Sequence, residues 1–369
     1  MIKYLDLKAI NRPYESAANE VLHSGWYLQG EATSRFERHY ADYIGTRHCV
    51  GVANGLDALT LILRAYKEQG ILYDGDEVIV PANTYIASIL AITENNLTPV
   101  LVEPDVSTLQ IDDSLIEQVI THRTRAIMIV HLYGRCAYTD RIGHICRQYG
   151  LLLIEDNAQA HGCTYVSPAS PPSQQKKTGA LGHAAAHSFY PSKNLGAFGD
   201  AGAVTTDDDK LAAVIRSIAN YGSSRKYVFD YIGRNSRIDE LQAAILDAKL
   251  PDLDAANCRR NEIADIYINK VDNPQITVPK CGRNSVWHVF PVFCEHRDIL
   301  RQYLLDNGVE TQIHYPIPPH RQHCYPQWNH ISLPITEHIH ARELSIPCNQ
   351  AMTKEEADLI VSLLNSFRV

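Results

Sequence analysis

Short apolar runs alternate with longer helical stretches over the first half of the chain, and this rhythm limits the folds open to it. Five runs have the length and composition of buried strands: residues 78–80, 100–102, 126–130, 151–154 and 184–189. Residues 85–94 and 141–149 have helical character. Strands that alternate with helices form a mainly parallel sheet, and ligands bind at the carboxyl ends of its strands. We therefore expect an α/β fold with its functional site at that edge.

Two of these runs lead directly into residues with chemical potential. The run at 151–154 is followed by Asp156, and the run at 184–189 is followed by Lys193. This pair is what a pyridoxal 5′-phosphate (PLP) enzyme needs, because the lysine amine forms a Schiff base and the carboxylate keeps the pyridine nitrogen protonated. Taken singly, a surface lysine and a helix-capping aspartate are the ordinary explanations. The Pro-Ser-Lys-Asn sequence and the glycines that follow it favour the PLP interpretation.

Other residues gain meaning beside such a lysine. Gly55 and Leu56 open a helical run, and the free N–H groups of a helix start suit a phosphate, to which Ser188 adds a hydroxyl. Tyr85 follows a strand end and can stack on a pyridine ring, and Gln159 can reach the ring hydroxyl. Without the lysine, a capped helix start, a core tyrosine and a solvent-facing amide would be the better interpretations.

Composition argues against several other classes of protein. The chain has 369 residues and a net charge of −8, with no basic block of the kind that binds nucleic acid. No apolar run approaches transmembrane length, and the first residues lack the apolar stretch of a signal peptide. Nine scattered cysteines without a C-x-x-C pair favour reduced thiols in a cytoplasmic protein. We expect no membrane partner and no metal, since PLP itself acts as the electron sink.

The pattern changes after about residue 245, which predicts a large domain over residues 1–246 and a smaller α/β domain over residues 247–369. The smaller domain is expected to contain a long helix, a strand and two further helices: residues 247–267, 286–293, 298–307 and 354–367. Within the large domain, residues 165–178 are rich in proline and polar side chains, which is typical of an exposed loop inserted between two core strands.

At these residues the chain resembles the DegT/DnrJ/EryC1/StrS family of PLP-dependent sugar aminotransferases. The likeness runs through most of the chain, and its anchors are residues 81–88, 131–134, 155–162, 188–202 and 233–244. The resemblance implies the type I fold of aspartate aminotransferase and homodimers whose active sites lie at the subunit interface. It also implies that the enzyme moves an amino group, with L-glutamate expected as the donor, to a keto sugar on a nucleotide.

The same resemblance assigns roles to individual residues. Lys193 is the Schiff-base lysine and proton shuttle, Asp156 the pyridinium partner, Gln159 the ring-hydroxyl partner and Tyr85 the stacking residue. Gly55, Leu56 and Ser188 bind the phosphate, helped by Asn235 of the other subunit. The expected contacts with the sugar nucleotide are Tyr221, Lys226, His314 and Tyr315.

The pattern at residues 54–59 is similar to that of enzymes that aminate C3 of a dTDP-linked 3-keto-6-deoxyhexose, for use in a surface polysaccharide such as lipopolysaccharide O antigen. A C4-acting relative of the perosamine synthase kind is the alternative, and Arg135-Cys136 and the 165–178 insertion depart from the family pattern. Two rivals have a related fold. A sugar dehydratase would place histidine where Lys193 stands, and a regulatory protein would not need the complete set of cofactor residues. The exact keto sugar and its C4 configuration stay open.

Overall fold

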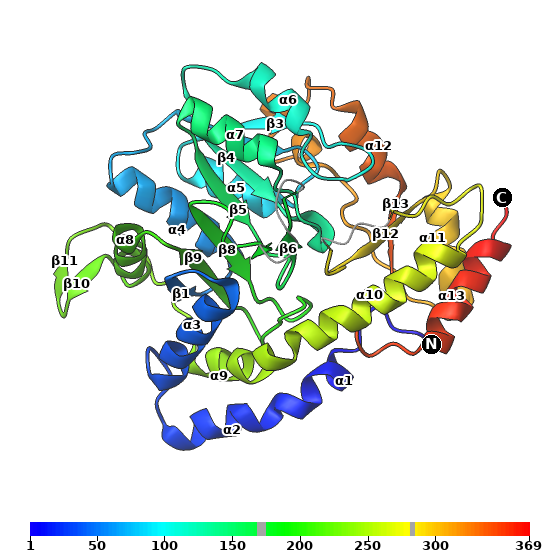
Figure 1. The fold of residues 1–369 in the computed structure, drawn as a ribbon, viewed down its shortest axis with the longest axis horizontal. Coiled ribbons are helices and arrows are strands. Elements are labelled where there is room, and N and C mark those ends of the chain that lie inside the picture. The colour runs from blue at the N-terminus through cyan, green and yellow to red at the C-terminus, as the bar shows by residue number, and fades with distance from the viewer. Residues whose placement is uncertain (168–174, 281–284) are drawn as a thin grey trace.

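The computed structural model, drawn in Figure 1, describes residues 1–167, 175–280 and 285–369. Its strands are β1 (His48–Val52), β2 (Glu77–Pro81), β3 (Thr98–Val102), β4 (Thr124–Val130), β5 (Leu152–Asp156), β6 (Thr164–Tyr165), β7 (Lys176–Lys177), β8 (Ala184–Ser188), β9 (Gly202–Thr206), β10 (Ser223–Arg225), β11 (Val228–Phe229), β12 (Phe290–Phe293) and β13 (Glu343–Ile346). Its α-helices are α1 (Leu7–Asn11), α2 (Glu15–Ser24), α3 (Glu31–Ile44), α4 (Gly55–Glu68), α5 (Ile86–Glu94), α6 (Asp113–Ile116), α7 (Asp140–Tyr149), α8 (Asp209–Ala219), α9 (Glu240–Lys249), α10 (Leu253–Lys270), α11 (Arg297–Asp306), α12 (Pro334–Arg342) and α13 (Lys354–Ser366). No helix among these residues is both long enough and apolar enough to cross a membrane.

A seven-stranded sheet forms the centre of the fold, in the order β1-β9-β8-β5-β4-β2-β3. The pairings among β3, β2, β4, β5 and β8 are parallel, and only β9 runs antiparallel to its neighbours β8 and β1. The predicted α/β fold with a mainly parallel sheet is therefore confirmed. The five predicted strands and the two predicted helices of this half are present to within two residues at each end.

Helices cover both faces of this sheet, which explains why its strands read as continuous apolar runs. In β4, Met128 faces a core built with α4, α5 and α8, whereas Ile127 and Ile129 face a second core built with α7. Successive side chains of a strand point to opposite faces, so each strand contributes to both cores. The carboxyl ends of the parallel strands remain open at one edge, as the sequence analysis expected.

The predicted helix over residues 247–267 is two helices. The α9 helix begins earlier, at Glu240, and ends at Lys249, a 3₁₀ helix spans Leu250–Asp252, and α10 follows. Pro251 accounts for the break, because proline lacks the N–H that would continue the α-helical ladder. The predicted domain boundary at residues 246 and 247 thus lies inside α9, and the division into two domains stays a prediction.

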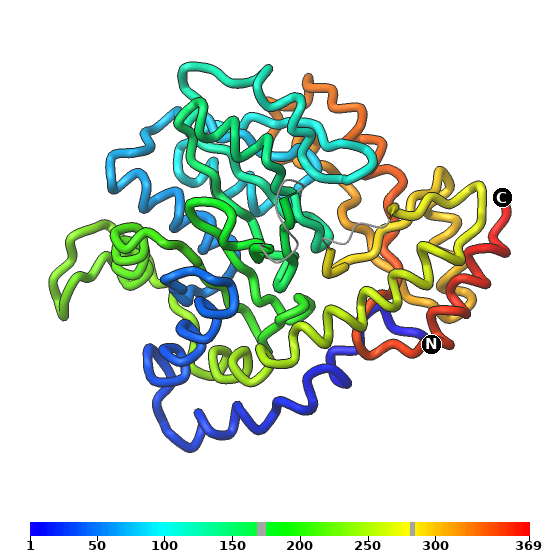
Figure 2. Tube along the Cα trace, in the orientation of Figure 1, coloured from blue at the N-terminus to red at the C-terminus, as the bar shows by residue number. Residues whose placement is uncertain are grey.

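The predicted strand at 286–293 is also shorter, since β12 contains only Phe290–Phe293. The preceding residues pair elsewhere: Ser285 forms a bridge with Arg135, and the Val286 N–H donates to the Gly134 carbonyl. The β12 strand pairs with β13 beside α10, α11 and α13. Figure 2 shows the N-terminal segment running to this smaller core, where Ile2 is buried. The predicted helices at 298–307 and 354–367 correspond to α11 and α13.

The insertion predicted at residues 165–178 lies between β5 and β8. Its ends pair as the short antiparallel strands β6 and β7, and its centre, residues 168–174, falls outside the described residues. The cysteines of the described chain are free thiols.

Candidate active site

A cleft of about 520 Å³ opens at the carboxyl ends of the parallel strands. Nine of the residues predicted for the site line it: Gly55, Leu56, Tyr85, Asp156, Gln159, Ser188, Lys193, His314 and Tyr315. These residues come from segments spread over more than 250 positions of the chain, between Gly55 and Tyr315. Their gathering in one cleft is what the prediction of a common site required. Their roles there remain predictions.

Lys193 and Asp156 form the electrostatic centre of the cleft. Asp156 is the last residue of β5. Lys193 follows β8 in a turn that is closed by a hydrogen bond of 2.8 Å from the Lys193 backbone N–H to the Tyr190 carbonyl. Burial lowers the pKa of Lys193 to about 8, although the charge of Asp156 opposes this shift. Burial raises the pKa of Asp156, opposed in turn by its hydrogen bonds and by the charge of Lys193. A lysine that titrates near neutrality is suited both to nucleophilic attack and to proton transfer.

Ser88 holds the Asp156 carboxylate, and the sequence analysis gave it no role. Its hydroxyl donates to Asp156 Oδ2 at 2.7 Å, while Asp156 Oδ1 accepts from the Ala158 N–H at 3.2 Å. The Thr84 hydroxyl lies 2.8 Å from the Ser88 hydroxyl and is left to donate to it. Both side chains are buried. Thr84 precedes α5 and Ser88 lies in its first turn, and nothing in the local sequence indicates their partner Asp156, 68 residues away.

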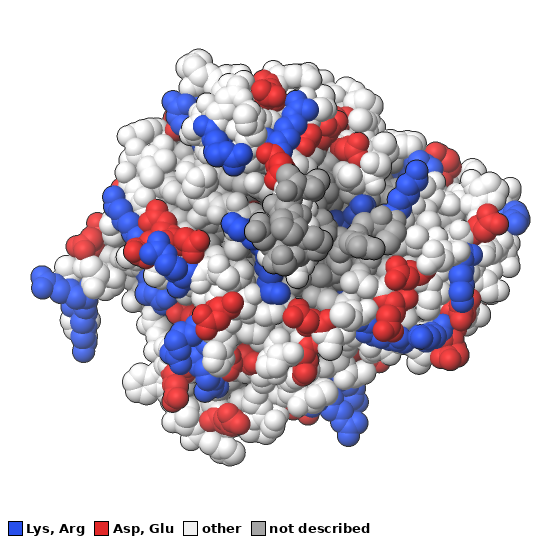
Figure 3. All heavy atoms as spheres, viewed as in Figure 1, with Lys and Arg blue, Asp and Glu red and all other residues white. Residues whose placement is uncertain are grey.

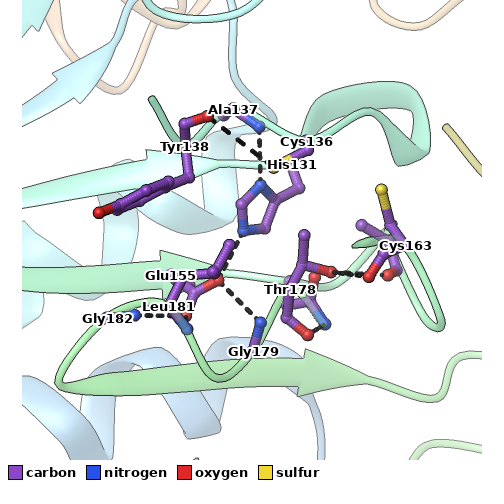
Figure 4. Close-up of polar contacts among 12 residues, drawn as sticks. His131, Cys136, Ala137, Tyr138, Glu155, Cys163, Thr178, Gly179, Leu181 and Gly182 are labelled. Atoms are coloured by element: carbon purple, nitrogen blue, oxygen red, sulfur yellow. Dashed lines mark hydrogen bonds and ion pairs between the residues drawn. The ribbon is translucent and has the colours of Figure 1, made fainter. Parts of the chain in front are cut away.

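Glu155, the neighbour of Asp156, points to the opposite face of the sheet and serves the scaffold. Figure 4 shows its carboxylate between His131 and the returning segment of the insertion: His131 Nε2 lies at 2.8 Å, and the N–H groups of Gly179, Leu181 and Gly182 donate at 2.7, 2.8 and 2.7 Å. The pair formed by His131 and Glu155 is fully buried. Four hydrogen bonds on one carboxylate offset the cost of burying its charge.

Gln159 connects the cofactor region with the predicted sugar contacts. Its Oε1 accepts from the Tyr133 N–H at 2.6 Å, and its Nε2 donates to the Tyr315 hydroxyl at 3.0 Å. These two contacts fix which end of the amide faces which partner. The Tyr315 ring in turn lies 4.8 Å from the Tyr85 ring, centroid to centroid. Tyr85 is half exposed, so it offers an open aromatic face to the cleft.

The start of α4 forms a cradle for an anion. Asn54 caps the helix by accepting from the Asp57 N–H at 2.8 Å, which leaves the first N–H groups and the positive end of a 14-residue helix facing the cleft. A Cβ atom added to Gly55 would lie 2.5 Å from Ser188 Cβ, so only glycine allows β8 and α4 to approach this closely. With Lys193 for an aldehyde and Asp156 for a ring nitrogen, the described residues fit PLP.

Three predicted contacts lie outside this cleft. Asn235, Tyr221 and Lys226 are exposed and do not line it. Tyr221 precedes β10, and Lys226 lies in the turn between β10 and β11, which project from the body of the molecule (Figure 1). The structure of one chain therefore assembles most of the predicted site and leaves these three side chains apart.

Known proteins are similar to this chain over most or all of its length. The model of the DegT/DnrJ/EryC1/StrS aminotransferase family matches residues 9–365. A dTDP-3-amino-3,6-dideoxy-alpha-D-galactopyranose transaminase from Aneurinibacillus thermoaerophilus is 50% identical, over 100% of this chain and 99% of its own. The crystal structure of DesV from S. venezuelae in complex with a ketimine intermediate matches with a TM-score of 0.93 and 41% identity, covering 100% of this chain and 99% of that one.

A third likeness bears on the cofactor. The crystal structure of NtdA from Bacillus subtilis with bound cofactor PMP matches with a TM-score of 0.84 and 31% identity, over 95% of this chain and 80% of that one. The predicted type I fold and the predicted use of PLP are thereby confirmed. The chain belongs to the DegT/DnrJ/EryC1/StrS aminotransferase family.

Proposed function

We propose that this enzyme transfers the amino group of L-glutamate to C3 of a dTDP-linked 3-keto-6-deoxyhexose, giving 2-oxoglutarate and a dTDP-3-amino-3,6-dideoxyhexose. The observation that carries the proposal is the cleft that joins Lys193, Asp156 and the anion cradle of α4. The name of the relative at 50% identity supports C3 as the aminated carbon.

The residues of the cleft divide the work. Bound PLP supplies the electron sink that stabilises the negative charge left when the donor loses its α-proton. Lys193, with its pKa near 8, holds the cofactor aldehyde and then carries the proton between donor and cofactor carbons. Asp156 keeps the ring nitrogen protonated, and Ser88 keeps Asp156 ionised. The N–H groups at Gly55 and Leu56 and the Ser188 hydroxyl bind the phosphate.

The sugar nucleotide enters from the side of His314 and Tyr315. Diphosphate and nucleotide fix the far end of the sugar, so the depth of the cleft decides whether C3 or C4 meets the cofactor. A small displacement at that point costs rate steeply. The direct test is NMR analysis of the product formed with glutamate and either a 3-keto or a 4-keto dTDP-6-deoxyhexose. Amine at C3 is expected, and amine only at C4 would overturn the C3 assignment while leaving the aminotransferase in place.

We further propose a homodimer in which each subunit completes the other's site. The β10–β11 arm supports this, because Tyr227, Phe229 and Ile232 are 82%, 57% and 84% exposed on it. Apolar side chains gathered on a projecting arm are typical of a surface that is covered by a partner. Basic side chains stand at the end of the same arm (Figure 3), where Arg225 and Lys226 lie in the sequence, and suit a diphosphate.

Subunit mixing tests this assembly. Lys193→Ala and Asn235→Ala subunits are each expected to be inactive alone, and mixed dimers are expected to regain activity because one of the two hybrid sites has both residues intact. Mixed dimers that form without recovering activity would count against a shared site. The cytoplasmic location and the use of the product in a surface polysaccharide stay predictions.

A further inference from the structure

A buried carboxyl group lies behind His314. Glu343, in β13, accepts the His314 backbone N–H with Oε2 at 2.6 Å, and its Oε1 shares a hydrogen bond with the Ser345 hydroxyl. The Ser345 hydroxyl oxygen also lies 2.8 Å from His314 Nδ1. Glu343 and Ser345 are fully buried, and Gln312 pairs with Ser345 through two backbone hydrogen bonds, so the three side chains are held in register. They form a relay from Glu343 through Ser345 to the imidazole.

Only one nitrogen of the imidazole is left for a ligand. Nδ1 is engaged by Ser345, Nε2 has no hydrogen-bond partner among the described residues, and His314 lines the cleft. Burial lowers the pKa of His314 to about 4, with the charge of Lys193 acting in the same direction. The ring is therefore neutral at physiological pH and carries a single N–H. Whether that hydrogen is on Nδ1 or Nε2 decides whether the cleft meets a donor or an acceptor.

The protonation state of Glu343 controls the tautomer of His314 through the single hydrogen of the Ser345 hydroxyl. If Glu343 is ionised, Ser345 donates to it and accepts from Nδ1–H, so Nε2 is a bare acceptor. If Glu343 is protonated at Oε1, it donates to Ser345, Ser345 donates to Nδ1, and Nε2 carries the hydrogen. One hydroxyl thus converts the protonation state of a buried acid into the hydrogen-bonding character of a cleft residue.

The surroundings of Glu343 favour its neutral form. Burial raises the pKa of Glu343 to about 8, opposed by the hydrogen bonds from Ser345 and the His314 N–H and by the charge of Arg297 on α11. The other titratable groups that face it are tyrosines, which are neutral over this range: Tyr4 of the N-terminal segment, Tyr133 after β4, and Tyr315. The Tyr4 hydroxyl also hydrogen-bonds to Ser345 and, as a donor, leaves the Ser345 hydrogen to the relay in both states.

We propose that Glu343 is a positioning residue that, in its protonated form, acts through Ser345 to present His314 Nε2–H as a hydrogen-bond donor to an oxygen of the sugar substrate. The inference rests on the proposed function for the identity of that substrate. The relay itself is a property of the protein alone. The relay and the contact with substrate can therefore be refuted by separate experiments.

The relay is tested by ¹⁵N NMR of histidine-labelled enzyme without substrate, with the His314 signals identified by their loss in His314→Asn. The expected tautomer is Nε2–H at pH 7 and Nδ1–H at pH 9.5. Glu343→Gln keeps the donor to Ser345 and the acceptor for the His314 N–H, so Nε2–H should persist at both pH values. Ser345→Ala should uncouple the tautomer from pH. A parent enzyme with one tautomer at both pH values, or a Glu343→Gln variant that still switches, would overturn the relay.

The contact with substrate is tested by the KM for the keto sugar. In the parent enzyme, KM should rise about tenfold from pH 7 to pH 9.5, the loss expected for one hydrogen bond in a closed site. Lys193 also titrates between pH 7 and pH 9.5, so part of any rise in KM can come from Lys193. The deciding comparison is therefore with Glu343→Gln, in which the part of the rise that is due to the relay should vanish. Ser217→Ala is the matched control, because Ser217 is a buried serine whose hydroxyl has no partner among the described residues. A tautomer that switches without any change in KM would overturn the substrate contact.

Discussion

Replacing Ser88 by alanine removes one hydrogen bond from Asp156, the residue that we propose holds the pyridine nitrogen of the cofactor. The Ser88 hydroxyl is 2.7 Å from Asp156 Oδ2, and both side chains are buried. A hydrogen bond to a charged group contributes about 1.5–3 kcal/mol, and each ~1.4 kcal/mol corresponds to a factor of ten. Because burial already raises the pKa of Asp156, losing this donor raises it further. We expect kcat/KM to fall by about 10- to 100-fold in Ser88→Ala.

Thr84→Val provides the graded comparison. It removes the hydroxyl that lies 2.8 Å from Ser88 and leaves the contact between Ser88 and Asp156 in place. Loss of one neutral hydrogen bond, about 1 kcal/mol, should lower kcat/KM about fivefold. The assay is steady-state turnover at saturating PLP, with thermal unfolding to verify that each variant is folded. A Ser88→Ala enzyme within twofold of the parent, or a Thr84→Val enzyme that is the more impaired of the two, would refute the reasoning.

Three further outcomes follow from the same structure. Borohydride reduction of the PLP-loaded enzyme should label Lys193 and not Lys249. Burial also lowers the pKa of Lys249 to about 8, but its amine donates to the Gly196 carbonyl outside the cleft. Label on both residues would mean that pKa alone selects the lysine. Gly55→Ala should weaken PLP binding about tenfold in fluorescence titration, since the new Cβ meets Ser188 at 2.5 Å, and unchanged affinity would exclude the anion cradle. The native state keeps a proton on Glu343 up to pH about 8 while the unfolded chain releases it near pH 4.5, so the free energy of unfolding should fall between these pH values by a few kcal/mol. Urea titrations should show that component missing in Glu343→Gln, and identical pH profiles would contradict it.

The sequence analysis found the parts of the site that local patterns determine. Asp156 and Lys193 each follow an apolar run, and both lie where a parallel sheet places the ends of its strands. Ser88 and Glu343 escaped it because their meaning depends on partners 68 and 29 residues away, Asp156 and His314. No local pattern reports such a distance.

The boundaries of one helix and one strand also depend on more than the local apolar pattern. Apolar periodicity continues across Pro251, so the pattern predicted one helix where the backbone forms two. The strand predicted at 286–293 lost its first half for a tertiary reason, since Val286 hydrogen-bonds to Gly134 rather than to β13, the partner of β12. In both places the apolar residues are buried as expected, and their partners decide the backbone conformation.

The carboxylate of Glu155 has a consequence for how this enzyme tolerates change. Between β5 and β8 the chain leaves the sheet and returns at Gly179, and three backbone N–H groups there are tied to Glu155 before β8 begins. The start of β8, the strand that leads to the turn with Lys193, is therefore set by Glu155, whatever number of residues precedes it. The insertion can gain or lose length during evolution without moving the lysine. Asp156, one residue further and on the other side of the sheet, is insulated from the same variation.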